Sequence, residues 1–259
     1  MQATQQIDGV RPVAFVTGAS YGIGAACALA LARDGYDIAI SATRVENLAN
    51  TIARLKTSGR RVLPVALDLN QQPSIELAMA AVLAAFGRAD VLVNNAAANL
   101  RKKALDITPD EWDACLRVNL TGTFFLTQQM GRQLIAAKRP GSIISITSVQ
   151  GVIGADQRSA YGIGKAGAMQ MSRMLAIEWA EHGIRANTVA PGRLDTESPS
   201  RKSTVGREPD YLTAMISKIP LHRLCTVEDV AAAVSYLAGG QASYITGQSL
   251  MLDGGLTAC

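Results

Sequence analysis

A chain of 259 residues is long enough to bury a sizeable core, and an α/β protein of this length is ordinarily one domain. Hydrophobic residues make up 48% of the chain and charged residues 18%, which argues against disorder. The 25 basic and 21 acidic residues leave a net charge of +4 with no basic block that is interleaved with aromatics, so we expect no nucleic-acid partner. No apolar run reaches the ~18 residues of a membrane span, so we expect no membrane partner.

The cysteines and histidines are too few and too scattered for a metal site or a disulfide framework. They are Cys27, Cys115, Cys225, Cys259, His182 and His222, and no two cysteines form a C-x-x-C pair. The first eleven residues are polar and lack the apolar core of a signal peptide. We therefore expect a reduced, cytoplasmic protein without a metal.

Short apolar runs alternate with longer amphipathic segments along the whole chain, which predicts a parallel sheet covered by helices on both faces. The seven expected strands are residues 12–17, 37–42, 61–67, 89–95, 141–147, 184–190 and 248–254. Expected helices include residues 24–35, closed by Gly35, and residues 228–240, for which Thr226 is the N-cap and Asp229 completes a capping box. With right-handed crossovers, these elements give one doubly wound α/β domain over residues 1–259.

The first strand leads into the sequence TGASYGIG, in which Gly18, Gly22 and Gly24 open the first helix. A helix N-terminus presents unpaired N–H groups and a positive dipole end, which suit a pyrophosphate. Gly18 would permit the tight turn, Gly22 the approach of the phosphates, and Gly24 the packing of helix on strand. A tight turn without a ligand is the alternative.

The sequence SAYGIGKAGAM places Tyr161 four residues before Lys165, so both side chains lie on one face of a helix. A nearby ammonium group favours the phenolate, which would let the tyrosine exchange protons nearer neutral pH. Gly162 and Gly164 disfavour a helix interior by about 1 kcal/mol each relative to alanine, so they indicate that space is needed there.

A polar stretch follows the sixth strand, from Gly192 to Asp210, and has no apolar period. Loops of this length are usually functional or disordered, and this one lies at the carboxyl end of a strand, where open α/β sheets bind ligands. We expect a substrate lid at about residues 192–215, with a surface loop as the alternative.

The ordered set of motifs resembles the short-chain dehydrogenase/reductase family over nearly the whole chain. The set comprises T-G-x-x-x-G-x-G, Asp68–Leu69, N-N-A-A at residues 94–97, Asn119 in V-N-L, Ser148 ending I-T-S, Tyr161-x-x-x-Lys165 and A-P-G at residues 190–192. The resemblance implies a Rossmann-type fold and an NAD(P)-dependent oxidoreductase that acts on CH–OH groups.

The resemblance also implies catalytic roles for four residues. Tyr161 would give or take the proton at the substrate oxygen, and Lys165 would lower the pKa of Tyr161 and hold the nicotinamide ribose. Ser148 would hydrogen-bond the substrate oxygen, although it could merely cap the strand end. Asn119 would open its helix slightly and hold a water that relays protons to the lysine.

Cofactor contacts follow in the same way. The residues expected to contact the cofactor are Gly18, Ser20, Tyr21, Gly22, Ile23, Gly24, Arg44, Asp68, Leu69, Asn95, Ala96, Tyr161, Lys165, Pro191, Gly192 and Thr196. The second strand ends without an acid at Ala42 and Thr43, and Arg44 follows, which favours NADP(H) over NAD(H) because arginine accommodates a 2′-phosphate. Tyr21 stands where many NADP-dependent relatives carry a basic residue, so the preference rests on one cation.

The substrate is less determined, since one fold hosts many functions. The segment with Arg101, Lys102 and Lys103 resembles gluconate 5-dehydrogenase and 2-deoxygluconate 3-dehydrogenase relatives, and an arginine can bind a carboxylate in bidentate fashion. A solvated basic turn is the alternative. Gln150 and Arg193 are further polar candidates. A 3-oxoacyl-thioester reductase is the alternative enzyme, and a nucleotide-binding regulator is the non-enzymatic alternative.

The long helices near residues 109–138 and 159–182 carry apolar residues on more than one face. The relatives pair such helices into tetramers, so we expect a homo-oligomer.

Overall fold

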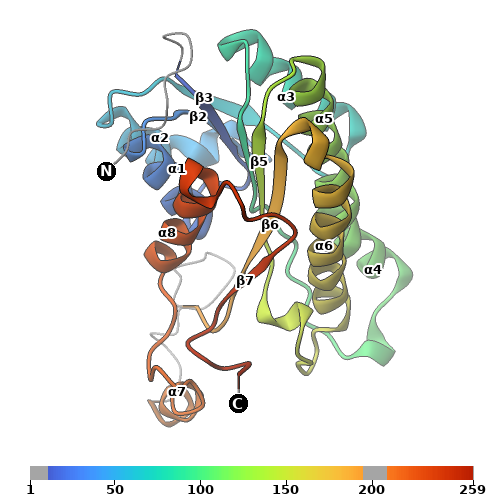
Figure 1. The fold of residues 1–259 in the computed structure, drawn as a ribbon. Coiled ribbons are helices and arrows are strands. Elements are labelled where there is room, and N and C mark those ends of the chain that lie inside the picture. Colours follow the sequence, from blue (N-terminus) through green and yellow to red (C-terminus); the bar gives the residue numbers. More distant parts are fainter. Residues whose placement is uncertain (1–10, 195–208, 259) are drawn as a thin grey trace.

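The computed structural model describes residues 11–194 and 209–258, and it contains a seven-stranded parallel sheet (Figure 1). The strands are β1 (Val13–Val16), β2 (Asp37–Ala42), β3 (Val62–Ala66), β4 (Val91–Asn94), β5 (Gly141–Ile146), β6 (Ile184–Pro191) and β7 (Ser249–Leu252). Each overlaps an expected strand, and the spatial order is β3-β2-β1-β4-β5-β6-β7. The prediction of a doubly wound parallel sheet is confirmed.

Helices lie on both faces of this sheet. They are α1 (Gly22–Arg33), α2 (Ala49–Lys56), α3 (Gln72–Phe86), α4 (Pro109–Leu116), α5 (Gly122–Ala136), α6 (Ser159–Glu178), α7 (Pro209–Ile216) and α8 (Val227–Ala238). Short helical turns occur at η1 (Val45–Leu48), η2 (Ala104–Asp106), η3 (Arg117–Thr121) and η4 (Val149–Gly151). None of the helices within the two described ranges is long and apolar enough to cross a membrane.

Alternate residues of β1 point to opposite faces of the sheet, and each face has its own hydrophobic core. Ala14 and Val16 join the core beneath α1 and α8, and Val13 and Phe15 join the core beneath α3, α5 and α6. Figure 1 shows α1 and α8 on one side of the sheet and α3, α5 and α6 on the other. A parallel strand that is buried on both faces reads as a continuous apolar run, which is why the strands could be recognised in the sequence.

The strand order changes direction at β1, because β2 and β3 lie on one side of it and β4 to β7 on the other. Ligands of open α/β sheets bind at the carboxyl ends of the strands on either side of such a point. The glycine loop after β1 and the residues after β4 are therefore in the position where this topology forms a ligand crevice.

The capping box predicted at the start of α8 is present. The Asp229 backbone N–H donates to Thr226 Oγ1 at 3.1 Å, and the Thr226 N–H donates to Asp229 Oδ2 at 2.9 Å. The Arg223 guanidinium donates to the Asp229 carboxylate at 2.6 Å. That hydrogen bond, together with the N-cap contacts, lowers the pKa of Asp229 to about 2.

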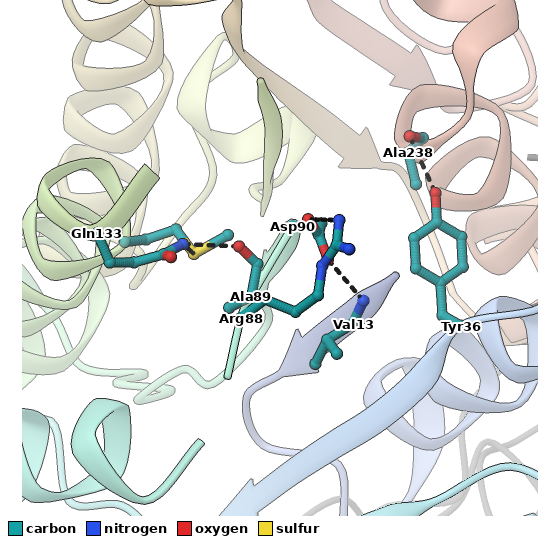
Figure 2. A network of polar contacts seen from close by, with 8 residues as sticks. Val13, Tyr36, Arg88, Ala89, Asp90, Gln133 and Ala238 are labelled. Carbon is teal, nitrogen blue, oxygen red and sulfur yellow. Dashed lines mark hydrogen bonds and ion pairs between the residues drawn. The ribbon is translucent and has the colours of Figure 1, made fainter. Parts of the chain in front are cut away.

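A polar network lies at the end of the sheet where β1 and β4 begin, opposite the carboxyl ends of the strands (Figure 2). Asp90 Oδ2 accepts hydrogen bonds from the Val13 backbone N–H and from Arg88 Nε, both at 2.8 Å. Arg88 Nη2 contacts Asp90 Oδ1 at 2.6 Å, and Gln133 Nε2 donates to the Ala89 carbonyl at 2.6 Å. The network ties β1, β4 and α5 together far from the carboxyl ends of the strands.

Most of the segment expected as a lid, including Thr196, lies outside the described residues. At its described beginning, Leu194 forms an isolated parallel bridge with Cys225, and the Cys225 N–H donates to the Arg193 carbonyl at 2.8 Å. At its described end, α7 follows directly before the turn that leads to α8.

Candidate active site

The glycine loop is shaped by close backbone contacts. Gly18 has φ +65°, and a Cβ there would lie 2.9 Å from Ala96 Cα. A Cβ on Gly24 would lie 2.4 Å from the Gly18 carbonyl oxygen and 2.6 Å from Asn95 Nδ2. Gly22 has φ +59°, and a Cβ there would meet no heavy atom within 4 Å. Gly18 and Gly24 therefore serve packing, whereas Gly22 faces open space in which a ligand could lie.

The N-terminus of α1 has no side-chain cap. Tyr21 is the N-cap residue, its side chain accepts no hydrogen bond from the first turn, and it is 47% exposed. The free N–H groups of this turn can therefore bind an anion. The Ser20 carbonyl of this loop accepts a hydrogen bond from Thr51 Oγ1 at 3.3 Å. Ile23 packs on the core beneath α1.

The residues after β4 hold the glycine loop. Asn95 Nδ2 donates to the carbonyl oxygens of Thr17 and Gly18, both at 2.9 Å, and Thr17 Oγ1 accepts from the N–H groups of Asn95 and Ala96 at 3.0 Å. The side-chain amide of Asn95 is therefore engaged with the protein. Its observed contacts order the cradle in which a cofactor would lie.

The ends of β2 and β3 provide the remaining candidates on this side. Arg44 is exposed just after β2, and within the two described ranges its guanidinium forms no ion pair. Asp68 is half-buried, and its Oδ1 accepts from the Asn70 N–H and side-chain amide at 2.9 and 2.8 Å. Leu69 is buried against the start of α5, where a Cβ on Gly122 would be only 2.1 Å from the Leu69 carbonyl oxygen.

Tyr161 and Lys165 come from the first turns of α6, as expected. Lys165 is 4% exposed, its Nζ donates to the Ile146 carbonyl at 2.9 Å, and it lies 5.6 Å from the centre of the Tyr161 ring. Burial lowers the pKa of Lys165 to about 8, and the thiol of Cys115 acts weakly in the opposite direction. The ammonium group is thus held beside the phenol and shielded from water.

Other segments of the protein pack closely against the two glycines between Tyr161 and Lys165. A Cβ on Gly162 would lie 2.7 Å from the Gln150 carbonyl oxygen, and a Cβ on Gly164 would lie 3.1 Å from Asn119 Cβ. The space that the sequence indicated therefore lets η4 and the turn before α5 approach α6 closely. This approach brings Gln150 and Asn119 next to the catalytic candidates.

Asn119 lies in the π-helical turn η3, where the helix between α4 and α5 widens. Its Nδ2 donates to the carbonyl oxygens of Ala98 at 2.7 Å and Cys115 at 2.9 Å. Its Oδ1 is buried and accepts no hydrogen bond among the described residues. A buried acceptor without a partner among the described residues can hold an ordered water.

Ser148 follows β5 and is the N-cap of η4, where its Oγ accepts from the Gln150 N–H at 3.2 Å. The capping role and a role toward substrate are compatible, because the hydroxyl proton is still free to donate. Gln150 Oε1 is buried without a hydrogen-bond partner in the described part of the chain.

Pro191 is the last residue of β6, and Gly192 follows it, where the Gly192 N–H donates to the Leu252 carbonyl at 2.9 Å. A Cβ on Gly192 would be 2.8 Å from Asp253 Cα, so the glycine is needed for close packing on β7. Arg193 is exposed at the start of the segment expected as a lid.

The basic segment that follows β4 contains two lysines with carboxylate partners. Lys102 Nζ pairs with Glu111 at 2.8 Å and Lys103 Nζ pairs with Asp156 at 2.6 Å. Arg101 is exposed and forms no ion pair within residues 11–194 and 209–258, although its charge contributes to the lowered pKa of Asp156, of which the Lys103 hydrogen bond is the main cause. Arg101 is therefore the one of the three that forms no ion pair with a described carboxylate.

Sequence reasoning missed Arg158. Its guanidinium carbon lies 5.1 Å from the centre of the Tyr161 ring, and its Nη1 donates to the side chain of Asn99 and to the Leu100 carbonyl at 3.3 Å. The signal that could have found it is its position, since a residue three before Tyr161 is one turn away on the same side of the chain. In the same two described ranges, no three His, Cys, Asp or Glu side chains gather closely enough to hold a metal ion.

The parts of a redox site thus converge at the carboxyl edge of the sheet. An uncapped helix N-terminus with open space beside Gly22 suits a dinucleotide pyrophosphate, and the phenol, the ammonium and the Ser148 hydroxyl come from adjacent elements. Such an arrangement can exchange a proton with an oxygen while a dinucleotide exchanges a hydride.

Comparisons with known proteins agree with this chemistry. A family model described as enoyl-(acyl carrier protein) reductase matches residues 18–257. The 3-oxoacyl-[acyl-carrier-protein] reductase of Thermotoga maritima is 34% identical over 94% of this chain and 97% of its own length. The D-threitol dehydrogenase of Mycolicibacterium smegmatis is 36% identical over 97% and 94%. A solved structure described as a candidate 2-deoxy-D-gluconate 3-dehydrogenase from Agrobacterium tumefaciens, with bound NADP, superposes with a TM-score of 0.86 at 30% identity over 96% and 97% of the two chains.

Proposed function

The chain belongs to the short-chain dehydrogenase/reductase family, and on that premise we propose that it transfers a hydride between NADP(H) and a small hydroxylated acid such as a keto-gluconate. Its relatives are NAD(P)-dependent dehydrogenases acting on CH–OH groups, so the chain is an oxidoreductase of that kind. The family membership therefore favours an enzyme over the alternative of a nucleotide-binding regulator with the same fold.

The cradle would hold the cofactor through the N–H groups of α1 and the open space at Gly22, with Asn95 keeping the loop in shape. When bound, the nicotinamide supplies or accepts the hydride. Tyr161 would protonate the alkoxide during reduction and accept the alcohol proton during oxidation. Ser148 would donate a hydrogen bond to the same substrate oxygen and stabilise its developing charge.

Lys165 would support Tyr161 through its charge, because an ammonium close to the ring favours the phenolate. The buried, unpartnered Asn119 Oδ1 would hold a water that passes protons toward Lys165. Both assignments rest on the position of Lys165 within α6 and on the packing of Asn119 against Gly164 of the same helix.

The observation that supports NADP(H) is Arg44, which is exposed just after β2 and forms no ion pair within the two described ranges. Ala42 and Thr43 at the end of this strand offer no acidic side chain to a ribose 2′-hydroxyl. A phosphate would give Arg44 a charge-assisted partner. The NADP bound in the 2-deoxy-D-gluconate 3-dehydrogenase-like structure is in keeping with this preference.

The observation that carries the substrate proposal is that Arg101 forms no ion pair with any described residue, whereas the two neighbouring lysines do. An exposed arginine in the segment after β4 could bind a substrate carboxylate in bidentate fashion. A 3-oxoacyl-thioester reductase is the second candidate, since reductases of that kind are among the relatives and a cavity of about 770 Å³ near η2 and η4 is lined by Val152, Ile153 and Ile163.

The test is nicotinamide absorbance with the purified protein, run with NADPH and NADH against a keto-gluconate, a simple ketone and an acetoacetyl thioester. Turnover of the keto-gluconate with NADPH supports both assignments. Arg101→Ala should then raise KM for the keto-gluconate at least tenfold and leave cofactor affinity unchanged, whereas the control Lys103→Ala should change KM less than threefold, because Lys103 already has a carboxylate partner. Turnover of the thioester alone would replace the substrate proposal.

We also propose that the chain forms a homo-oligomer, a tetramer by analogy with its family. Ile163, Met174 and Ile177 lie at helical spacing on α6 and are 50%, 49% and 78% exposed, which forms an apolar stripe on the surface of a monomer. Sedimentation would measure the assembly.

We further propose a cytoplasmic location, because Cys27, Cys115 and Cys225 are free thiols, as is usual in a reducing compartment.

A further inference from the structure

Arg158 occupies a position that the family mechanism does not use. It is the N-cap residue of α6, but its side chain does not cap the helix and instead extends toward the Tyr161 ring. The guanidinium carbon is 5.1 Å from the ring centre, within the ≈ 6 Å over which a cation is attracted to an aromatic face.

The guanidinium also reaches across to the loop after β4. Its Nη1 donates to the Asn99 side chain and to the Leu100 carbonyl, and the Lys102 N–H donates to the Gln157 carbonyl at 3.1 Å. Two segments that are far apart in sequence are thereby joined directly over the phenol. The ring of Tyr161 consequently has one cation from the preceding turn and one, Lys165, from the following turn.

We propose that Arg158 is a positioning residue for Tyr161, which holds the phenol ring at the loop after β4 and stabilises its phenolate form. The inference rests on the proposed role of Tyr161 as the proton donor and acceptor. A full positive charge interacts more strongly with an anionic phenolate than with a neutral phenol, so the contact favours loss of the proton.

Among the described residues, the other charged side chains of the segments that Arg158 joins are paired with each other or exposed. Lys103 and Asp156 form an ion pair with each other, as do Lys102 and Glu111 of α4. Arg101 is exposed beside Asp156.

Cys115 of α4 interacts electrostatically with Lys165. Among the described residues, Arg158 and Lys165 are therefore the cations whose loss should affect Tyr161 most.

The test needs neither substrate nor cofactor. Ultraviolet absorbance of tyrosinate is titrated against pH in the wild-type protein and in Tyr161→Phe, and the difference isolates Tyr161 from the other five tyrosines. The same difference is taken between Arg158→Met and the double variant Arg158→Met/Tyr161→Phe. We expect the midpoint for Tyr161 to rise by about one pH unit in Arg158→Met, because an opposite charge at this distance moves a titration by that order.

Two variants make the result specific. Arg158→Lys keeps a charge and should restore at least half of the shift, and Lys103→Met removes a neighbouring cation without touching the ring and should move the midpoint by no more than a few tenths of a pH unit. An unchanged midpoint in Arg158→Met, or an equal shift in Lys103→Met, overturns the proposal. If Arg158→Met does not fold, Arg158→Gln takes its place in the same comparison. Because no turnover is measured, failure of the proposed function would appear separately, as activity retained by Tyr161→Phe.

Discussion

Lys165 Nζ donates a hydrogen bond of 2.9 Å to the carbonyl oxygen of Ile146, the last residue of β5. This contact attaches the first turns of α6 to the strand that continues into Ser148. The helix that carries the phenol and the strand end that carries the hydroxyl are thus fixed relative to each other by a buried cation. Burial of that cation has a thermodynamic cost, which can be measured.

Lys165→Met should make the protein more stable near neutral pH while abolishing catalysis. The pKa of Lys165 falls from 10.5 to about 8 on folding, so the unfolded chain binds more protons between these values and stability rises with pH across that window. Below pH 8 both states are charged, and the full cost of burial is present, up to about 3 kcal/mol. We expect a gain of about 1–3 kcal/mol in the free energy of unfolding, reduced by the lost hydrogen bond to Ile146.

Urea unfolding of Lys165→Met and wild type near neutral pH and again above pH 10 measures this gain. The difference should shrink at the higher pH, since the lysine is then largely neutral in the folded protein and is becoming neutral in the unfolded chain. A gain that does not depend on pH would mean that packing, and not charge burial, accounts for it.

Tyr161→Phe should reduce kcat by about 10²–10⁴-fold, because it removes the proposed proton donor and leaves the ring in place. Cofactor affinity should change less than threefold, since the cradle lies on the glycine loop and the ends of β2 to β4. Fluorescence titration with NADPH measures the second quantity. Retained turnover would contradict the role of Tyr161, while loss of both properties would indicate a misfolded variant.

Gly22→Ala and Gly24→Ala form a matched pair that separates ligand space from packing. A Cβ on Gly24 would lie 2.4 Å from a backbone oxygen, so Gly24→Ala should destabilise the protein by several kcal/mol or prevent folding. Gly22→Ala meets no protein atom and should cost only about 1 kcal/mol for its positive φ. It should nevertheless weaken cofactor binding at least tenfold, because the methyl group projects into the open space. Equal affinity in Gly22→Ala and wild type would show that the pyrophosphate lies elsewhere.

The strands, the glycine loop and the Tyr161–Lys165 pair could be predicted because each depends on local pattern: buried parallel strands are continuous apolar runs, and i, i+4 residues share a helix face. The capping box at Thr226 and Asp229 was predictable for the same reason. The prediction that Gly162 and Gly164 leave space was correct, but the sequence did not reveal that Gln150 and Asn119 occupy it.

The contact of Arg158 with the loop after β4 was not predictable, because it depends on a meeting between residues 99–102 and 156–158. These segments are about 57 residues apart in sequence, and their contact follows from the order of β4 and β5 in the sheet. No local periodicity encodes that contact. The ion-pair partners of Lys102 and Lys103 are also distant in sequence. That these two lysines are paired and Arg101 is not can therefore be seen only in the folded chain.

Arg44→Ser should raise the Kd for NADPH about tenfold and leave the Kd for NADH within twofold, because the charge-assisted hydrogen bonds to a 2′-phosphate are each worth about 1.5–3 kcal/mol and are partly screened at an exposed site. Arg54→Ser, which removes an exposed arginine from the neighbouring α2, is the control and should change neither value. Fluorescence titration with both cofactors decides the result. A parallel loss of NADPH and NADH affinity would instead indicate a structural role for Arg44.

Asp90→Ala should destabilise the protein without affecting the site. Asp90 receives hydrogen bonds from Val13 and Arg88 while only 12% of its side chain is exposed, and removing one partner of a buried ion pair costs about 3–5 kcal/mol (Figure 2). We expect a loss of about 3 kcal/mol in the free energy of unfolding, measured in urea.

Asp156→Ala is the matched control for Asp90→Ala, because its ion pair with Lys103 is more than 60% exposed on both sides and should contribute less than about 1 kcal/mol. Because Asp90 lies where β1 and β4 begin and the reacting groups lie where the strands end, kcat and KM of Asp90→Ala should equal those of wild type at temperatures where the variant is folded. A change in kcat in that variant would mean that the amino-terminal end of the sheet is coupled to the site, and a loss below 1 kcal/mol would mean that Arg88 is resolvated when its partner is removed.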